Sequence, residues 1–565
     1  KTYTYDERNR LAQKDLPGTE FDETYTYTDN GLKETVTDGR GTTRYGYDEQ
    51  NRLTERIDPD GRTIAYSYDS AGNRTSVEIP SGTTNYTFDA QNRLKTVTDP
   101  DGGVTAYTYN AVGNLERTEF PNGTVETREY DDLNRLVYIE NSGPNGIINS
   151  FRYTLDDTGN RTEVNEHDGR RVVYEYDDLY RLESEIIYEP NSAGPSRIIE
   201  YVYDYAGNRV SRTDTCEATT LYTYEDNDQL KTATTDGVVT NYTYDNNGNT
   251  TSKTTDGTTV TYTWNADNRL IGADTDGDGV DDVENRYNEN GIRVSQTVNG
   301  EETRFLIDEN RPYAQVLEEY TPGGIIKVSY VHGNDLISQV REDEKSFYYV
   351  DGLGSTSALS DESGNVIEQY IYEGFGQLIN QNNVQTSNIY QYAGEQFDHA
   401  VGEYYLRARF YNPSTGRFSV RDPFSGFLSE PFTLNKYIYG NANPISFTDP
   451  SGEVGLLKTL AGFVVANAIR GAVIGAVAVV FSPGVLKVLG TYSAPQVRNI
   501  FDTLEPNAPL TWHFHKVSEI FFLGINIFTD VDVPADPRRQ FRYFSHRLRL
   551  SGGTVSYELA YEARH

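Results

Sequence analysis

An aspartate-rich segment at residues 274–282 has the spacing of a calcium-binding loop. Acidic oxygens stand at loop positions 1, 3 and 5, a glycine at 6, a backbone carbonyl at 7 and another acid at 9. Position 12 holds Asn285 rather than a bidentate Glu, with Glu284 beside it. A bare acidic turn is the alternative, in which the carboxylates repel one another. The candidate ligands for calcium, the expected cofactor, are Asp274, Asp276, Asp278, the Val280 carbonyl and Asp282.

Histidines and arginines gather near the C-terminus. His513 and His515 alternate, so on a strand they would face one way and could bind a metal or do acid–base work. A set of histidines and arginines suits nuclease or nucleotidyl chemistry. These residues match no known catalytic motif, and isolated histidines are mostly structural. The candidate residues of this part are His513, His515 and His546.

A repeat fills most of the remaining chain and must position these residues. Two aromatic residues separated by one residue precede an acidic or amide residue and then Asn-Arg-Leu or Gly-Asn-Arg, as in Tyr3-Thr4-Tyr5-Asp6. The period is 20 to 22 residues, with occasional insertions. The second aromatic residues are Tyr5, Tyr27, Tyr47, Tyr68, Phe88, Tyr109, Tyr130, Tyr176, Tyr203, Tyr224, Tyr244 and Trp264.

Each repeat predicts a β-hairpin. Side chains alternate along a strand, so both rings lie on one face. The Asp, Asn and Gly residues that follow favour a turn, and pairs such as Asp60-Gly61 mark the other end of the unit. A single hairpin is marginally stable, so we expect neighbouring hairpins to pair and to stack arginines over tyrosine rings. An aromatic stripe that binds sugars or peptides is the alternative.

Composition agrees with a repetitive β protein. The chain has 45 Tyr and 49 Gly but only 2 Trp and 1 Cys. Its net charge of -35 opposes nucleic-acid binding by the bulk of the chain. Cys216 alone cannot form an intramolecular disulfide, so packing and strand pairing must supply stability. Because Lys1 lies inside a repeat, we expect a fragment of a longer protein, without its targeting signal.

On these repeats the sequence resembles the YD-repeat proteins, which comprise bacterial Rhs proteins, the C components of insecticidal toxin complexes and the animal teneurins. The resemblance covers roughly residues 1–452 and implies a long β-sheet strip that spirals into a closed, hollow shell. The expected fold class is therefore mainly β, with a small C-terminal α or α+β module. The expected domains are a YD array (1–300), a core domain (301–452), an apolar segment (453–490) and a variable C-terminal module (491–565).

The expected core domain resembles the Rhs-associated core, which plugs one end of the shell in the family. Segments such as Tyr349-Val350-Asp351-Gly352 and Tyr392-Ala393-Gly394-Glu395 carry this resemblance. The domain ends at the P-x4-D-P-x-G border, in which Pro444, Asp449, Pro450 and Gly452 are the fixed positions. In relatives the chain cuts itself one residue beyond this glycine, which is Glu453 here.

The resemblance also implies that core aspartates perform the cleavage. In a pair of carboxyls, one stays protonated as the acid while the other activates water. Asp422 and Asp449 are the candidates, and Arg421 or Arg417 is near enough in sequence to tune a pKa.

Two departures from the family pattern could weaken cleavage. Glu453 stands where relatives usually have Leu or another apolar residue. The stretch Phe432-Thr433-Leu434-Asn435 has no acidic residue, where many relatives carry Asp or Gly. The alternative is that Asp422-Pro423 and Asp449-Pro450 are plain turn dipeptides.

The composition changes abruptly after Gly452. Residues 455–490 are apolar and rich in Ala, Gly and Val. The longest uninterrupted apolar run, 471–482, is shorter than the roughly 20 residues that a membrane helix needs. Helices packed inside the shell and a membrane-active segment both fit this stretch.

The leading hypothesis is a polymorphic-toxin delivery protein whose shell encloses and releases a C-terminal effector. Its expected partners are its own cargo module, a secretion apparatus, an immunity protein and a target-cell surface, and its expected location is secreted or on the bacterial cell surface. The alternative is a cell-surface adhesion or structural protein of teneurin type, in which the shell is the binding scaffold. The array has no His-, Cys- or Ser-centred constellation of an enzyme.

Overall fold

The computed structural model describes residues 1–17, 22–379, 388–424, 426 and 431–453, together with the backbone of five short strands beyond them. The chain divides into two compact units, Lys1–Phe463 and Val464–His565.

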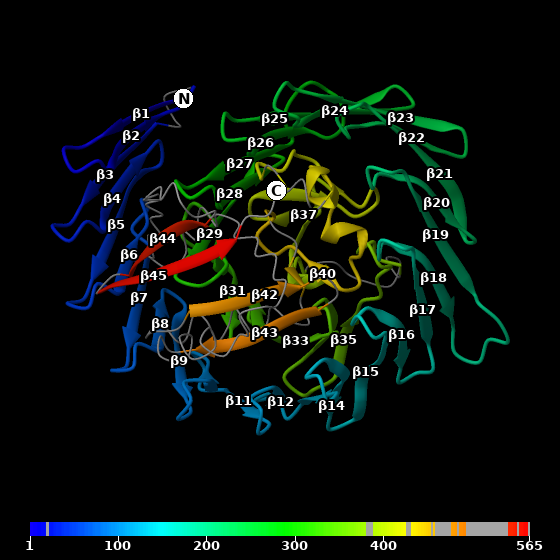
Figure 1. The fold of residues 1–565 in the computed structure, drawn as a ribbon, viewed down its shortest axis with the longest axis horizontal. Helices are drawn as coiled ribbons and strands as arrows, with labels where there is room; N and C mark the ends of the chain where they lie inside the picture. The colour runs from blue at the N-terminus through cyan, green and yellow to red at the C-terminus, as the bar shows by residue number, and fades with distance from the viewer. Residues whose placement is uncertain are drawn as a thin grey trace. The chain divides into compact units, whose positions relative to one another are not determined.

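The first unit is built on one antiparallel sheet of 35 strands in which each strand pairs with its neighbours in sequence. In Figure 1 the sheet runs through β1–β25 and then turns inward at β26–β29. We call β1–β26 the first course and β29–β35 the closing strands. The first course comprises β1 (Thr2–Tyr5), β2 (Leu11–Asp15), β3 (Glu23–Tyr27), β4 (Lys33–Asp38), β5 (Gly41–Tyr47), β6 (Leu53–Ile57), β7 (Thr63–Tyr68), β8 (Arg74–Ile79), β9 (Gly82–Phe88), β10 (Leu94–Thr98), β11 (Val104–Tyr109), β12 (Leu115–Glu119), β13 (Val125–Tyr130), β14 (Leu136–Gly143), β15 (Gly146–Leu155), β16 (Arg161–Glu166), β17 (Arg171–Tyr176), β18 (Leu182–Tyr188), β19 (Arg197–Tyr203), β20 (Arg209–Asp214), β21 (Glu217–Tyr224), β22 (Leu230–Thr235), β23 (Val238–Tyr244), β24 (Thr250–Thr255), β25 (Thr258–Trp264) and β26 (Leu270–Asp274).

Two strands connect the first course to the closing strands. They are β27 (Val283–Tyr287) and β28 (Arg293–Val298). Pairing continues without a break through residue 300, the predicted domain boundary, where β28 pairs with β29. The closing strands are β29 (Glu301–Asp308), β30 (Gln315–Tyr320), β31 (Ile326–His332), β32 (Leu336–Arg341), β33 (Glu344–Val350), β34 (Thr356–Ser360) and β35 (Val366–Gln369).

The hairpin reading of the repeat is confirmed. Every one of the predicted second aromatic residues is the last residue of a strand. At Tyr68, for example, the strand register shifts and Asp69 begins the turn, where its Oδ1 accepts hydrogen bonds from the Ala71 and Asn73 amides at 2.9 and 2.8 Å. The local sequence therefore sets both the strand end and the turn.

The second aromatic residue also ties each hairpin to the preceding one. The Tyr68 hydroxyl donates to the Leu53 carbonyl at 2.7 Å, and the Arg52 guanidinium lies 4.7 Å from the Tyr68 ring centre. This confirms the predicted stacking of arginine on tyrosine. Equivalent hydrogen bonds are made by Tyr27, Tyr47, Tyr109, Tyr130, Tyr176, Tyr203, Tyr224, Tyr244 and the Trp264 indole.

The sheet closes through side chains far apart in sequence. Lys1 and Lys14 at its start both pair with Asp267, at 2.6 and 2.8 Å. The closing strands then pack on the first course: the Tyr349 hydroxyl donates to Thr124 Oγ1 at 2.7 Å, and every residue of β34 is buried. By contrast, exposed residues alternate along β23. Residue burial, rather than strand pairing, distinguishes most of the closing strands, such as β30, β33 and β34, although β35 is largely exposed.

A small four-stranded sheet follows β35 and carries the core segment. Its strands are β36 (Gln396–Asp398), β37 (Glu403–Leu406), β38 (Arg409–Asn412) and β39 (Arg417–Phe418). The Tyr411 and Tyr439 rings stack at 4.1 Å between centres, and the Thr250 amide donates to the Ser419 carbonyl at 3.0 Å. The core segment is thereby fixed to the first course. Three 3₁₀ turns lie at Tyr392–Gly394, Pro431–Leu434 and Gly440–Ala442.

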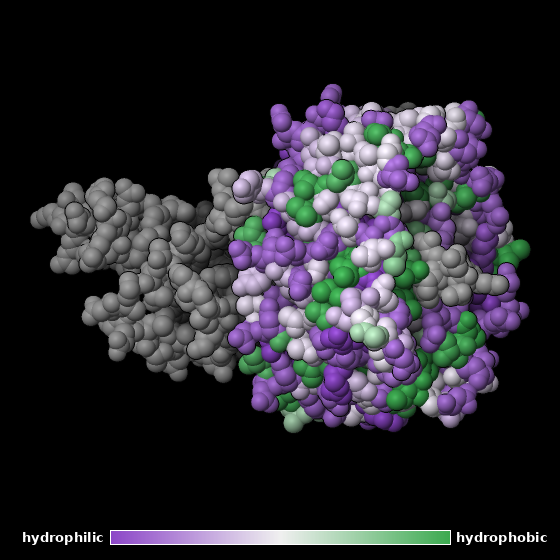
Figure 2. Space-filling model, turned by 90° about the vertical axis from the view of Figure 1, so that its right-hand side faces the viewer, coloured by the Kyte–Doolittle hydropathy of each residue, from purple (hydrophilic) through white to green (hydrophobic). Residues whose placement is uncertain are grey.

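One face of the first unit, which we call the shell unit, is mainly polar. Figure 2 shows a face on which hydrophilic residues dominate and hydrophobic ones lie in small groups between them. Scattered apolar residues of this kind are normal on protein surfaces. The pattern agrees with the strongly negative charge of the chain.

The described part of the second unit is β structure. Its hairpins pair β42 (Ala476–Ser482) with β43 (Val485–Tyr492) and β44 (Phe541–Leu550) with β45 (Gly553–Glu562). The first hairpin differs from the helices expected within 455–490, because its Val-rich sequence has β-branched residues that favour strands. Residues 458–475 lie outside the described residues. Among the residues that the structure describes, no helix has the length and apolar character needed to cross a bilayer.

Candidate functional site

Asp422 and Asp449 meet at one guanidinium. Arg409 Nη1 lies 3.0 Å from Asp422 Oδ2, and Arg409 Nη2 lies 3.2 Å from Asp449 Oδ2. Arg409 is 4% exposed and Asp449 2% exposed, so this ion-pair group is largely withdrawn from water. Two carboxyls that are distant in sequence are therefore neighbours in space.

Short strands place these three residues. Arg409 is the first residue of β38, and its guanidinium lies 3.6 Å from the Phe418 ring centre on β39. The Asp422 amide donates to the Lys436 carbonyl at 2.9 Å, which fixes the turn after β39. Asp449 directly follows β40 (Phe447–Thr448), which pairs with β41 (Leu456–Leu457). The end of the border, from Asp449 to Gly452, thus lies in the connection between two paired strands.

The border glycine fits only as glycine. Gly452 has φ +70°, and a Cβ there would collide with the Leu406 carbonyl oxygen and approach the Arg409 nitrogen to 2.9 Å. Arg409 Nε donates to the Gly452 carbonyl. The Glu453 amide donates to Asp449 Oδ1 at 3.1 Å. The same carboxylate and guanidinium therefore hold the chain on both sides of the Gly452–Glu453 peptide.

Neighbouring contacts fix the remaining border positions. The Pro450 carbonyl accepts a hydrogen bond from Arg407, which also pairs with Glu395 at 2.7 Å. The Pro444 carbonyl accepts one from the Tyr392 hydroxyl at 3.1 Å. These bonds hold the backbone of the whole border against the core segment.

The two carboxyls have unequal surroundings. Burial raises the pKa of Asp422, and the negative charge of Asp449 adds to this, while the nearby Arg409 opposes it. Asp422 therefore keeps a proton more readily than an ordinary aspartic acid, as a general acid requires.

The arginine at this site is one to which the sequence analysis assigned no role. Arg421 is exposed, and Arg417 donates to Asn208 Oδ1 at 2.8 Å, on the first course. Arg409 lies 13 residues before Asp422 and 40 before Asp449, as their numbers show. Strand alternation does not mark it, because Arg407 lies in the turn between β37 and β38, with a φ of 58°, whereas Arg409 begins β38.

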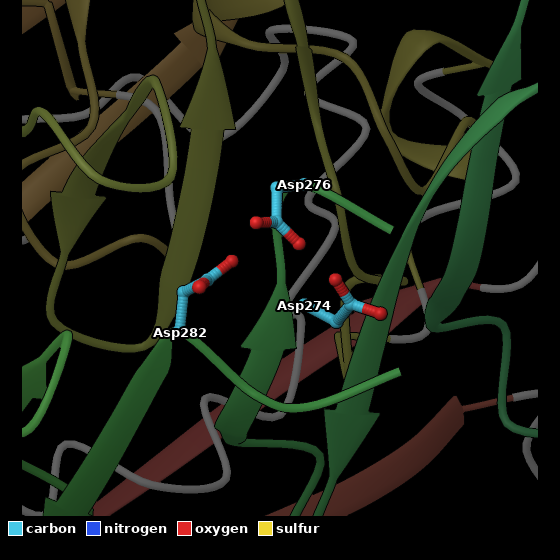
Figure 3. A group of neighbouring side chains, drawn as sticks. All are labelled: Asp274, Asp276 and Asp282. Carbon is cyan, nitrogen blue, oxygen red and sulfur yellow. The ribbon is translucent and has the colours of Figure 1, made fainter. Parts of the chain in front are cut away.

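The aspartate loop brings together three of its five predicted ligands. Asp274, Asp276 and Asp282 each place a carboxylate oxygen within 4.8 Å of the others, and Figure 3 shows the three carboxyl groups turned toward one another. Asp278 and Val280 are exposed outside this group, and the Asp278 carboxylate accepts the Val280 amide at 2.8 Å. The three grouped oxygens are a donor set that suits calcium.

Hydrogen bonds shape the loop. Asp274 accepts the Gly277 and Gly279 amides at 2.7 and 2.8 Å. Asp282 accepts the Thr275 hydroxyl and amide at 2.6 and 2.7 Å, and these bonds lower the pKa of Asp282. Burial, and then the charges of Glu284 and of two loop aspartates, raise the pKa of the adjacent Asp281. Uncompensated negative charge thus accumulates around the loop.

The structure does not describe the side chains of the candidate residues in the C-terminal module. His513 and His515 lie outside the described residues. His546 belongs to β44, opposite Tyr557 on β45, where only the backbone is described. Their role stays a prediction.

Known proteins share parts of this sequence. The tRNA3(Ser)-specific nuclease WapA of Bacillus spizizenii is 36% identical over 185 residues, which are 32% of this chain and 8% of the nuclease. Salivary gland surface protein 1 of Aedes aegypti is 28% identical over 188 residues, which are 33% of this chain and 5% of that protein. The chain therefore spans a small fraction of the length of these relatives. A solved TcdB2-TccC3-TEV structure aligns with a TM-score of 0.46 and 16% identity, over 80% of this chain and 28% of that chain.

Two family profiles match the repeats and the core segment. The RHS Repeat profile matches residues 27–63, 47–84 and 88–120. The Teneurin YD-shell profile matches residues 163–445, which are half of the chain. Asp422 falls inside this second range and Asp449 just beyond it. With its hairpin strip and matching core segment, the chain belongs to the YD-shell family of RHS-repeat proteins.

Proposed function

We propose that this chain is the shell and release border of a polymorphic toxin, which encloses a C-terminal effector and cuts it free. The arrangement at the border carries the proposal. Asp422 and Asp449 flank Arg409, and Arg409 also holds the Gly452 carbonyl. A buried Asp449 and a partly buried Asp422 beside the border have the groups that acid–base hydrolysis needs. Family membership and the similarity to a WapA nuclease support a toxin shell.

In the proposed reaction Asp422 is the acid and Asp449 the base. Asp449 takes a proton from water as the water oxygen bonds to the Glu453 carbonyl carbon. Asp422 gives its proton to the nitrogen of Val454, and the carbon–nitrogen bond breaks. Asp422 is suited to the acid role because burial raises its pKa, and Asp449 is aligned because it accepts the Glu453 amide. Arg409 balances the ionised member of the pair.

The proposed cargo is the region after Glu453, with His513, His515 and His546 as its candidate catalytic groups in a nuclease-like activity. A secretion apparatus, an immunity protein and a target cell are the partners that such a toxin needs, and secretion or display on a bacterial surface is the corresponding location. Expression of residues 454–565 alone, with growth as the readout, tests the cargo. Arrested growth supports a toxin, and normal growth with soluble protein present opposes it.

A denaturing gel of the purified chain tests the release step. Wild-type protein is expected to give two bands, and Asp449→Asn one band, because an amide cannot accept the proton from water. Asp361→Asn is a matched control, since Asp361 caps a turn in the closing strands through the Ser363 and Asn365 amides and has no contact with the border. Two bands in this control and in wild type, with one in Asp449→Asn, support cleavage. A single wild-type band contradicts it.

A second candidate function is cell-surface adhesion, with the shell as the binding scaffold. The grouped carboxylates of Asp274, Asp276 and Asp282 favour it, because extracellular calcium would stabilise such a loop. The similarity to a salivary gland surface protein points the same way. Calcium-dependent binding of an uncleaved chain to cells supports this candidate, whereas binding that chelation leaves unchanged opposes it.

A further inference from the structure

A buried pair of glutamates joins the first course to the segment that follows the closing strands. Glu185 is on β18, and Glu373 follows β35. Each is only 2% exposed. The Glu185 carboxylate accepts the Gly374 amide at 2.8 Å, so this contact directly links the two parts of the sheet. We call this contact region, Glu185 with residues 373–377, the seam.

The two carboxyls are unequally compensated. Glu373 pairs with Arg212 at 2.7 Å, but its Oε1 is buried without a hydrogen-bond partner among the described residues. Glu185 makes no ion pair within the described part of the chain, and it accepts hydrogen bonds from neutral donors, the Gly374 amide at 2.8 Å and the Tyr201 hydroxyl at 2.7 Å. Two buried carboxyls of which only Glu373 pairs with a cation favour retention of a proton.

The cations around the pair are already engaged. Arg212 also contacts Asp214 at 2.8 Å and Glu217 at 3.1 Å. Arg197 pairs with the same Asp214 at 2.6 Å, and Arg209 lies over the Tyr201, Tyr222 and Phe375 rings. The pair is also faced by phenols, namely Tyr174, Tyr176, Tyr201, Tyr203 and Tyr411. Further titratable groups line a cavity that Glu373 also lines, among them Glu166, His167, Asp168, Arg170, Asp351 and Glu368.

Water can reach the pair without the sheet opening. Glu373 and Gly374 line a cavity of about 510 Å³ between β16–β17 and residues 366–374. A proton can therefore enter or leave at Glu373. The seam itself is tightly packed, because a Cβ on Gly374 would lie 2.8 Å from both Glu185 Oε1 and a Leu182 methyl group. The packed residues of the seam therefore have little room to move apart when a second carboxyl becomes charged.

We propose that Glu185 and Glu373 form a proton-operated lock, which holds the seam closed while the pair retains one proton and loosens it when both carboxyls ionise. Burial raises the pKa of Glu185 to about 7, and the charge of Glu373 adds to this. Burial also raises the pKa of Glu373. A carboxyl with a raised pKa in the closed state stabilises that state at low pH, and the stabilisation is lost as pH rises through that pKa. The lock is therefore closed in acid and weakened in mildly alkaline solution.

Hydrogen exchange of peptides that contain Gly374 measures the lock. If the pKa of Glu185 is about 7 when the seam is closed and 4.5 when it is open, the opening constant rises roughly 30-fold between about pH 5.5 and pH 8.5. The protection factor is expected to fall by that ratio in the full wild-type chain. Glu185→Gln removes the titrating group, so its protection factor is expected to change little with pH.

Two further variants separate a lock from a merely structural contact. Glu373→Gln removes the second charge but keeps Glu185, so the pH response is expected to shrink and to shift to lower pH. Glu183→Gln, an exposed position on the same strand, is expected to behave as wild type. The proposal is overturned if wild type shows no fall in protection, or if Glu185→Gln and Glu373→Gln both show the same fall as wild type.

Discussion

Two groups of aspartates in the shell unit differ in what lies between their carboxyls. At the border, Asp422 and Asp449 contact opposite nitrogens of Arg409. In the loop, the carboxylates of Asp274, Asp276 and Asp282 approach within 4.8 Å of one another, and no ion pair within the described residues reaches them. The same residue type therefore sits in two opposite electrostatic settings.

The difference separates two kinds of chemistry. Burial raises the pKa of Asp422, so this carboxyl keeps a proton more readily than an ordinary aspartic acid. Hydrogen bonds from Thr275 lower the pKa of Asp282, so the loop keeps the ionised form that a cation needs. A built-in guanidinium favours proton transfer, whereas a group of ionised oxygens without a cation favours calcium.

The largest expected effect comes from removing the border cation. Arg409→Ala leaves the buried Asp449 and the partly buried Asp422 without their partner, which should cost about 3–5 kcal/mol of stability and abolish cleavage. Urea unfolding and a denaturing gel measure the two effects. Arg117→Ala is the control, because the Arg117–Glu119 pair is exposed and should contribute little. If the Arg409→Ala protein were still cleaved and were as stable as wild type, Arg409 would not be what distinguishes the border aspartates from the loop aspartates.

Calcium should act on the loop and not on the border. Saturating calcium at about a hundred times its Kd stabilises the bound form by about 2.7 kcal/mol. We expect calcium to raise the thermal unfolding midpoint of wild type and not that of Asp276→Asn. Asp278→Asn should keep most of the rise, since Asp278 lies outside the grouped oxygens. Identical midpoints with calcium and with a chelator would show that the loop is only an acidic turn.

The two groups should respond to pH in opposite ways. Cleavage needs protonated Asp422, so its rate should fall as pH rises through the raised pKa of that carboxyl, about tenfold per pH unit above it. Calcium binding needs ionised Asp282, so it should weaken as pH falls through the lowered pKa of that residue. Cleavage of freshly translated chains at several pH values and calcium titrations measure these trends. A cleavage rate that rises across the same range would reverse the assigned roles.

The smallest effect should come from the support of one loop ligand. Thr275→Val removes the hydroxyl that donates to Asp282 at 2.6 Å but keeps the side-chain shape. We expect calcium binding a few-fold weaker and a pKa of Asp282 closer to its ordinary value, because one stabilising hydrogen bond is lost. Thr259→Val, in the adjacent hairpin, tests whether any threonine has this effect. If both variants lost the same calcium affinity, the hydrogen bond from Thr275 to Asp282 would not be the cause.

The strand ends could be predicted from sequence because their causes are local. Tyr68 and Asp69 define a strand end and a turn within a few residues, and the same holds in each unit. The burial of the closing strands could not be predicted in this way. Contacts such as Tyr349 with Thr124 join residues 225 positions apart, and the repeat spacing holds no information on that pairing.

The same limit applies to the candidate site. Asp422 and Asp449 followed from the resemblance, and the loop followed from its spacing. Arg409 could not be predicted in this way. The nearest arginine in sequence, Arg421, is exposed, whereas Arg409 lies on a different strand and contacts Asp422 only in the folded chain. Spacing alone also could not separate Asp276 from Asp278, which differ in whether the turn directs the carboxylate inward.

Intact-mass measurement of the purified wild-type chain, under denaturing conditions, tests the release account most directly. The full chain has a mass of 63.7 kDa. The account predicts two species whose masses correspond to residues 1–453 and 454–565, and only the full-length species for Asp449→Asn. A wild-type protein that remains entirely at full length, or that is cut elsewhere than after Glu453, would contradict it.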